Sequence, residues 1–381
     1  MDLIAQPTAV SCEATPWWRT PLASAERKRL GILAAIVLAY AALANAAAIL
    51  VGGETASVFY RLNDHTLLVI GASLALIGLT HVIVTVINEP RLSVLARLWG
   101  DLKTHVLRRD RFLSLFVPLG LLPLFIPAFL TLKSLIPDVH PFAFDATFHA
   151  LDQAIHFGHD PWRITHALFG GPSATFALSF LYNLWFLLIW GVAFYVILRV
   201  DRPVERFHYL CALLVAWVLN GTLLAYLFSS AGPCYFGFIV DGPNPYQPLM
   251  DGLHALDARL AAEGSWMRIW TLEAQNALWA QHGTGDAATL GGISAMPSMH
   301  VSLSLVMAMG MWRFSRAFSA ALWVYAAAIF IGSVHFGWHY AVDGYVSLIA
   351  TVLIWKGLGH AIKRFGLDGA MPSTGESPSC G

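Results

Sequence analysis

The segment GGISAMPSMHVSLSLVMAMG, residues 291–310, joins a glycine-rich turn directly to an apolar helix. Pro297 and Ser298 precede the apolar run; serine commonly caps a helix, and proline is tolerated in its first turn. His300 therefore falls in the first turn of the predicted helix, where unpaired backbone N–H groups and the helix dipole favour an anion. A titratable side chain at the mouth of so apolar a helix indicates a functional site.

A second junction of this kind, SVHFGWHYAVDGY, lies at residues 333–345. One apolar run ends near His335, Gly337 interrupts it, and His339 opens the next. Asp343 follows His339 by four residues, which on a helix places both side chains on one face, one turn apart. A carboxylate in that position can hold the imidazole in one tautomer and stabilise its cationic form.

The composition is typical of an integral membrane protein. The 381 residues are 57% hydrophobic and 12% charged, with a mean hydropathy of +0.62. Soluble domains carry about 25% charged residues. The formal net charge is zero and no basic block occurs, so we expect no nucleic-acid partner. The four cysteines form no paired pattern, which indicates neither a disulfide framework nor a zinc site.

Apolar segments long enough to cross a bilayer recur along the chain. They lie near residues 30–51, 66–87, 112–132, 174–198, 208–228, 299–312, 317–334 and 341–362. Lys356 is the one lysine or arginine inside them. We therefore expect an all-α, polytopic membrane helix bundle of about eight transmembrane helices.

The basic residues predict the orientation, because cytoplasmic loops carry an excess of lysine and arginine. With a cytoplasmic N-terminus, 18 of the 23 basic residues fall on the cytoplasmic side. The outer five are Arg61, Lys133, Arg163, Arg259 and Arg268. We expect an integral protein of a bacterial inner membrane with both termini cytoplasmic. The two histidine-bearing junctions then face the periplasm or exterior.

Two long outer segments connect the spans. Residues 133–173 are rich in histidine and aspartate, which we interpret as a solvated or capping surface rather than a metal site. Residues 229–298 contain leucines at helical spacing and three tryptophans, and tryptophan favours the membrane boundary. This segment is either one or two helices on the outer leaflet or a packed cap over the bundle.

The motifs SAMPSMH and HFGWHYAVDGY resemble the second and third signature motifs of the type 2 phosphatidic acid phosphatase superfamily. The most similar variant is the branch that includes inositol phosphorylceramide synthase. The resemblance implies a six-helix catalytic core at 112–364. A cytoplasmic tail at 1–28 and two additional transmembrane helices with a basic loop at 29–111 would precede it. A disordered cytoplasmic tail at 365–381 would follow.

The resemblance also implies roles for the titratable residues. In the superfamily, the histidine of the third motif attacks phosphorus and forms a phosphohistidine; here this is His339. The aspartate that orients it corresponds to Asp343, and the histidine that protonates the leaving alcohol corresponds to His300. Ser298 matches the serine that helps to bind phosphate.

Three further residues are candidates for substrate binding. Gly292 allows the loop backbone to approach a ligand closely, and Ser294 lies in the same loop. The usual third motif has an arginine six residues before its histidine, but this position is Ser333 here. His335 is the candidate that replaces it.

The usual first motif, a lysine followed seven residues later by Arg-Pro, is missing. The chain has one Arg-Pro pair, Arg202-Pro203, and position 195 is a tyrosine. We reject this pair as a site element, because the predicted topology places it on the cytoplasmic side. The segments YNLW, 182–185, and AGPCYF, 231–236, also resemble the synthase branch.

These patterns favour a phosphotransferase or phosphatase that acts on a lipid phosphate at the outer leaflet. Nucleophilic attack by a neutral histidine with a second histidine as general acid needs neither metal nor cofactor. The acceptor is water, or a lipid or sugar alcohol. Two alternatives stay open: a metal-dependent membrane enzyme that uses His335, His339 and Asp343, and a non-catalytic transporter or scaffold with the histidines as a proton relay.

Overall fold

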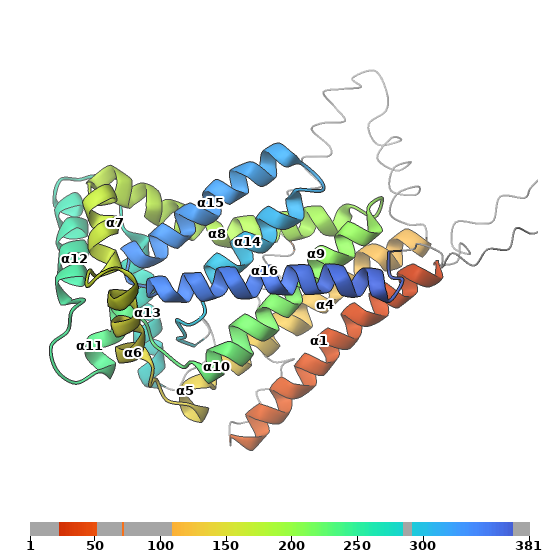
Figure 1. Ribbon diagram of the computed structural model, residues 1–381, viewed down its shortest axis with the longest axis horizontal. Helices are drawn as coiled ribbons and strands as arrows, with labels where there is room; N and C mark the ends of the chain where they lie inside the picture. Colours follow the sequence, from red (N-terminus) through yellow and green to blue (C-terminus); the bar gives the residue numbers. More distant parts are fainter. Residues whose placement is uncertain (1–22, 52–70, 72–108, 285–291, 369–381) are drawn as a thin grey trace, which may run out of the picture.

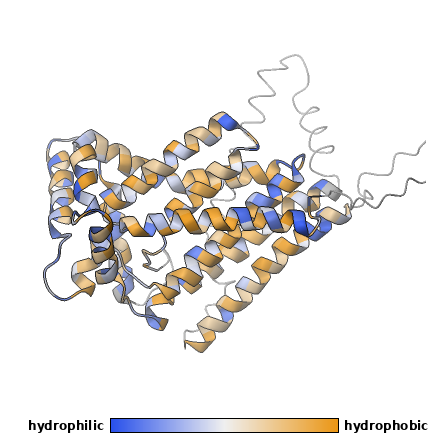
Figure 2. Cartoon of the chain, viewed as in Figure 1, coloured by the Kyte–Doolittle hydropathy of each residue, from blue (hydrophilic) through white to orange (hydrophobic). Residues whose placement is uncertain are grey.

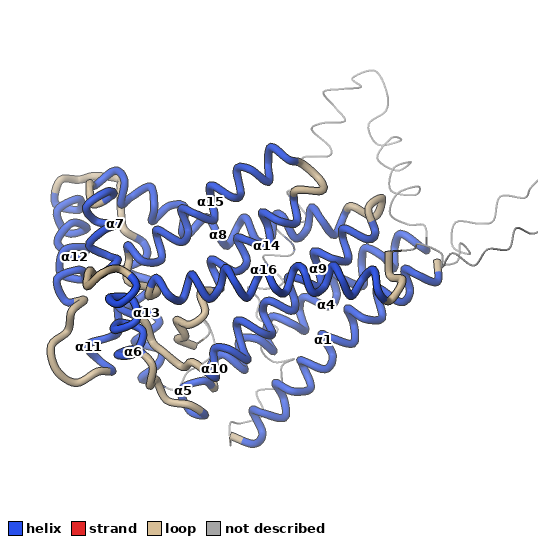
Figure 3. The backbone as a smooth tube through the Cα atoms, in the orientation of Figure 1, coloured by secondary structure: helices blue, strands red, loops and turns tan. Residues whose placement is uncertain are grey.

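The computed structural model describes residues 23–51, 71, 109–284 and 292–368. Within these ranges every regular element is helical and no strand occurs (Figure 3). This confirms the all-α prediction. Most of the predicted N-terminal tail, the predicted span at 66–87 apart from Gly71, most of the basic loop after it and the last part of the C-terminal tail lie outside the described residues.

Within the described residues, six helical segments are long and apolar enough to cross a membrane. They are Ser24–Leu50, Arg111–Val139, Pro172–Leu198, Pro203–Leu227, Arg316–His335 and Ala341–Arg364. The corresponding elements are α1 (Ser24–Leu50), α4 (Arg109–Ser134) with α5 (Ile136–Val139), α8 (Pro172–Leu198), α9 (Pro203–Val218) continued by η3 (Leu219–Leu224) and α10 (Ala225–Leu227), α15 (Arg316–His335) and α16 (Ala341–Arg364). The polytopic helix bundle is thereby confirmed. Figure 2 shows the apolar residues along these helices and polar residues toward their ends.

The predicted short span is α14 (Met299–Met311), which lies at the centre of the bundle and contacts α8, α9, α15 and α16 (Figure 1). Nearly all of its residues are buried, as expected for a helix that is apolar or small on every side. Thirteen residues give a helix only about 20 Å long. Residues 292–298 are not helical and lie directly before α14. They therefore bring loop backbone to the start of this short helix.

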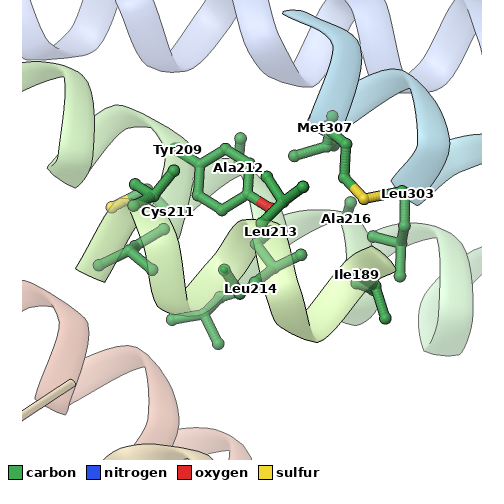
Figure 4. Close-up of a cluster of buried hydrophobic side chains, with 14 of the residues drawn as sticks. Ile189, Tyr209, Cys211, Ala212, Leu213, Leu214, Ala216, Leu303 and Met307 are labelled. Carbon is green, nitrogen blue, oxygen red and sulfur yellow. The ribbon is translucent and has the colours of Figure 1, made fainter. Parts of the chain in front are cut away.

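The core between α9 and α14 is closely packed. Figure 4 shows Leu213 and Ala216 of α9 together with Leu303 and Met307 of α14. Tyr209 of α9 lies against Gly310 of α14, where a Cβ atom would stand 2.4 Å from the tyrosine ring. Only glycine allows the two helices to approach this closely.

A layer of shorter helices covers one end of the bundle (Figure 1). It contains α6 (Asp145–Ile155), α7 (Pro161–Phe169), α11 (Phe236–Ile239), α12 (Gln247–Ala262) and α13 (Trp270–Thr284). Leu249, Leu253 and Leu272 of α12 and α13 are buried against Phe336 and Tyr340, which connect α15 to α16. The described residues of this segment, 229–284 and 292–298, therefore pack as a cap on the bundle, the second of the two predicted arrangements.

The opposite end of the bundle holds a buried ionic cluster. Glu26 of α1 accepts hydrogen bonds from Arg206 of α9, from Arg29 at 3.2 Å and from Ser114 of α4 at 3.0 Å. Residues 24–28, which the sequence assigns to the tail, are thus the first turn of α1. The cluster joins α1 to α4 and α9, and Arg29 also donates to the Leu367 carbonyl at 2.8 Å.

Replacing Glu26 by alanine should destabilise the protein, because it leaves the buried Arg206 guanidinium without its carboxylate. Removing one partner of a buried pair costs about 3–5 kcal/mol. The thermal unfolding midpoint in detergent measures this loss. Asp201→Ala, which removes the exposed partner of Arg199, is the matched control and should change stability by less than about 1 kcal/mol. Equal midpoints for the two variants would contradict the structural role of the cluster.

Candidate active site

The first junction begins α14 with a serine cap. Ser298 is fully buried, and its hydroxyl accepts a hydrogen bond from the Val301 N–H at 3.4 Å. The predicted cap is therefore confirmed, and His300 lies in the first turn of α14.

The second junction reverses the chain between α15 and α16. α15 ends at His335, and Gly337 has a φ of +68°, a left-handed conformation that favours glycine. His339 stands immediately before the α16 cap residue Tyr340. The spacing of His335, His339 and Asp343 therefore does not place three ligands on one continuous helix. No group of three potential metal ligands is found in the described part of the chain.

His339 is held by a backbone carbonyl as well as by the predicted aspartate. Its Nδ1 lies 2.7 Å from the Ala295 oxygen and 3.3 Å from Asp343 Oδ2. A carbonyl can only accept, so Nδ1 carries the proton and donates it. The other ring nitrogen, Nε2, is then unprotonated in the neutral ring, and no described residue hydrogen-bonds to it.

The charge state of His339 follows from its surroundings. Burial lowers the pKa of His339 to about 3; the Ala295 carbonyl opposes this shift and the positive charge of Lys133 adds to it. The imidazole is therefore neutral at physiological pH. A neutral ring with a free Nε2 is the form that can act as a nucleophile.

Asp343 lies behind His339 and is fully buried. Its Oδ2 also accepts the Tyr340 N–H at 3.0 Å, which completes a capping box at the start of α16. The aspartate thereby fixes the first turn of the helix and the histidine before it in one arrangement. Its Oδ1 accepts no hydrogen bond from the described residues.

Two further aspartates from α6 hold this junction. Asp152 accepts the N–H groups of Ala341 and Val342, both at 2.8 Å, and so caps α16 from another helix. Asp145, two turns earlier on the same face, accepts the Tyr340 hydroxyl at 2.8 Å. Burial raises the pKa of Asp145, and it raises the pKa of Asp152 to about 6 although the two N–H groups oppose the shift.

Asp145 also fixes a loop. It accepts the N–H groups of Ala231 at 2.9 Å and Gly232 at 2.8 Å. The sequence analysis predicted only a solvated or capping surface for these aspartates, because two acids seven residues apart do not reveal which backbone groups they bind.

A cavity of about 560 Å³ joins the two junctions. His300 and His339 both line it, together with Gly292 and Ser294 of the preceding loop. Four of the seven predicted site residues are therefore brought together around one space. Asp343 does not line the cavity and contacts it through His339.

The remaining two predicted residues lie elsewhere. Ser298 is not part of the lining and serves as the α14 cap. His335 is fully buried outside the cavity, where its ring stacks on His166 at 3.9 Å between centroids and its Nε2 lies 3.1 Å from the Thr175 hydroxyl. The structure therefore places neither side chain where it could contact a ligand in this cavity.

His300 lies within a group of aromatic rings. Its ring centroid is 4.4 Å from that of Tyr182 and 4.3 Å from that of Trp185, both on α8. Trp185 Nε1 also donates to the His300 carbonyl at 3.1 Å. These two residues are the first and last of the YNLW segment, which thus positions the predicted general acid.

Lys133, at the end of α4, is the one lysine or arginine among the lining residues that the structure describes. Its ammonium forms no hydrogen bond or ion pair with the described residues, and its charge acts on both His300 and His339. Gly292 brings the loop against it, because a Cβ atom there would stand 2.6 Å from the Lys133 carbonyl oxygen. The sequence analysis assigned Lys133 only to the outer side of the membrane. No pattern in the neighbouring sequence shows that α4 ends beside residue 292.

Much of the cavity wall is apolar, and one exposed acid, Glu273, also lines it. The apolar residues come mainly from α4, the α9 region and α13, and include Phe129, Leu130, Trp217, Trp270, Ala274, Ala277 and Leu278. The cavity therefore offers titratable groups on one wall and hydrocarbon on another.

A family model described as the PAP2 superfamily matches residues 146–356, more than half of the chain. The protein therefore belongs to this superfamily of type 2 phosphatidic acid phosphatases. It is a membrane protein of the phosphatase or phosphotransferase type. No curated protein and no solved structure matches the chain. The matched region contains both histidine junctions and ends at Lys356, within α16. Lys133 lies before the matched region.

The structural role of Asp152 can be tested with Asp152→Asn. Asparagine has one acceptor oxygen in place of two, so Ala341 or Val342 loses its partner inside the protein. A buried donor without a partner costs about 1–3 kcal/mol, and the thermal unfolding midpoint should fall accordingly. Asp251→Asn, at an exposed position on α12, is the control. A midpoint equal to that of the control would show that Asp152 does not hold α16.

Proposed function

We propose that the protein is a membrane-embedded lipid-phosphate phosphotransferase or phosphatase that works through a phosphohistidine on His339. The observation that carries this proposal is the neutral His339 ring, whose free Nε2 shares one cavity with His300.

In the first half of the reaction, the lone pair of His339 Nε2 forms a bond to phosphorus while the bond to the leaving oxygen breaks. The ring becomes cationic, and Asp343 stabilises this charge. The leaving oxygen takes a proton from His300, whose protonated form is favoured by the bound phosphate anion. In the second half, His300 removes a proton from the acceptor, whose oxygen attacks phosphorus and releases His339.

Lys133 supplies the positive charge that the phosphate needs. The family motif that usually provides a lysine and an arginine is missing, and Arg202 lies just before α9 at the opposite end of the bundle. An unpaired lysine in the cavity is a compact charge that can neutralise a phosphate oxygen. Its charge already reaches both histidines, so a phosphate bound between them lies in the field of the ammonium.

The lining supports a lipid as the substrate. The apolar wall from α4 and α13 accommodates hydrocarbon, and the histidine wall accommodates a phosphate group. The volume of about 560 Å³ is within the range of ligand pockets, roughly 300–1,000 Å³. The proposed acceptor is water in a phosphatase and a lipid or sugar alcohol in a transferase of the synthase type. The proposed location of the site is the outer leaflet of a bacterial inner membrane.

The covalent step predicts a trappable phosphoenzyme that is acid-labile and base-stable. His339→Ala should abolish both the phosphoenzyme and turnover, whereas the exposed His159→Ala should leave both unchanged. His300→Ala should form the intermediate slowly from an alkyl phosphate and nearly normally from a nitrophenyl phosphate, because a good leaving group needs no acid. Assays with water alone and with added alcohols identify the acceptor. A labelled phosphoenzyme in His339→Ala would refute the proposed nucleophile.

The role of Lys133 predicts a loss in kcat/KM without a loss of fold. A hydrogen bond to a charged group contributes about 1.5–3 kcal/mol, so Lys133→Gln should lower kcat/KM by about 10- to 100-fold. Lys133→Arg keeps the charge and should recover part of the loss. Arg259→Gln removes an exposed positive charge of the cap and is the control. Wild-type kcat/KM in Lys133→Gln would exclude Lys133 from phosphate binding and leave the histidine mechanism intact.

A further inference from the structure

A second hollow of about 750 Å³ lies at the end of the bundle opposite the histidine cavity. It runs between the first part of α15 and the last part of α16, with α9 and the end of α14 contributing to its walls. Figure 1 shows α15 and α16 diverging toward this end. We call it the α15–α16 groove.

The groove carries a row of polar residues from one face of α16. Lys356, Gly359, His360 and Lys363 line it at spacings of three and four residues, which is one face of a helix. Arg313, just after α14, adds a third permanent cation. This row is not part of the proposed reaction, because none of its residues lines the histidine cavity.

Lys356 stands eight residues before the end of α16, which is about 12 Å inside the helix end. It is exposed, and it forms no ion pair or hydrogen bond with the described residues. A charged residue within a membrane-spanning helix is costly unless it meets a partner or water. The Lys356 ammonium has no partner within the described protein, so it is available to an anionic group at this level of the membrane.

The walls of the groove are aromatic and closely packed. Trp312, Trp323 and Trp355 line it, and tryptophan favours the level of lipid headgroups. The His208 ring stacks on Trp355 at 4.0 Å between centroids and hydrogen-bonds to its carbonyl at 2.9 Å. Gly359 leaves room for His208, since a Cβ atom there would stand 3.3 Å from the ring.

Two acids also line the groove, so its charge is mixed. Glu205 lies 3.7 Å from Arg202, which offsets its charge, and Asp368 is the last residue of the described chain. The three cations exceed the two acids, and Lys356 lies deeper in the bundle than either acid along the helix axes.

We infer that the α15–α16 groove binds the phosphate headgroup of an anionic phospholipid, with Lys356, Lys363 and Arg313 as its cationic contacts. Basic pockets between transmembrane helices are suited to such headgroups. Trp312 and Trp323 on the groove wall are exposed and would lie against the acyl chains of a lipid whose headgroup the groove binds. This site is separate from the proposed reaction and stands or falls independently of it.

The test measures lipid affinity of the purified full chain in detergent by the shift of the thermal unfolding midpoint. Phosphatidylglycerol should stabilise the protein, and phosphatidylcholine with the same acyl chains should not. Removing one cation near an anionic group weakens binding by about fivefold, so Lys356→Gln should lower the affinity about fivefold and Lys356→Gln with Lys363→Gln about 25-fold. Lys356→Arg should bind as the wild type does.

The control is Arg364→Gln, which removes an exposed charge from the same helix end but outside the groove. A loss equal to that of Lys356→Gln would mean that surface charge alone attracts the lipid. A second control, Lys133→Gln, alters the histidine cavity; if it abolishes the response, phosphatidylglycerol binds there and the inference is wrong. Equal stabilisation by phosphatidylcholine, or full competition by free glycerol phosphate, would also overturn it.

Discussion

The arrangement of the candidate site depends on how the N-terminus of α16 is satisfied inside the protein. The first N–H groups of a helix have no partner within it, and here they are buried rather than hydrated. Asp152 accepts two of them and Asp343 accepts the N–H of the cap residue Tyr340. Because Asp152 belongs to α6, the layer of shorter helices that contains α6 must pack on the bundle at this point. His339, immediately before the helix, is thereby fixed as well.

The same constraint extends to the loop that faces His339. Asp145 binds the N–H groups of residues 231 and 232, and the neighbouring Ser230 carbonyl accepts the Ala295 N–H at 2.9 Å. The Ala295 carbonyl, on the other side of that residue, then accepts the His339 Nδ1 proton. The tautomer of His339 is therefore set through one helix, one loop and one carbonyl, and Asp343 is only one of several orienting groups.

The apolar spans and the two junctions could be predicted from the sequence, because hydrophobic length, helix caps and residues four apart are local signals. The described helices and the start of α14 at Ser298 agree with those signals. The long-range partners could not be predicted. Neither Lys133 beside Gly292 nor Asp152 beside α16 has a local pattern that reveals the contact. His335 shows the converse limit: its position in the sequence suggests the site, but the reversal at Gly337 places it outside the cavity.

The proposed reacting groups and the proposed charge for the phosphate come from different parts of the chain. His300, His339 and Asp343 lie within the region that matches the family, whereas Lys133 precedes that region. The contact that joins them is the approach of Gly292 to the end of α4. Any side chain at position 292 would meet the Lys133 carbonyl and Ser134 backbone, which belong to a helix that cannot yield without unpacking. The loop would therefore move, and with it the distance between the lysine and the two histidines. This close approach is what makes a lysine outside the family motifs part of the proposed site.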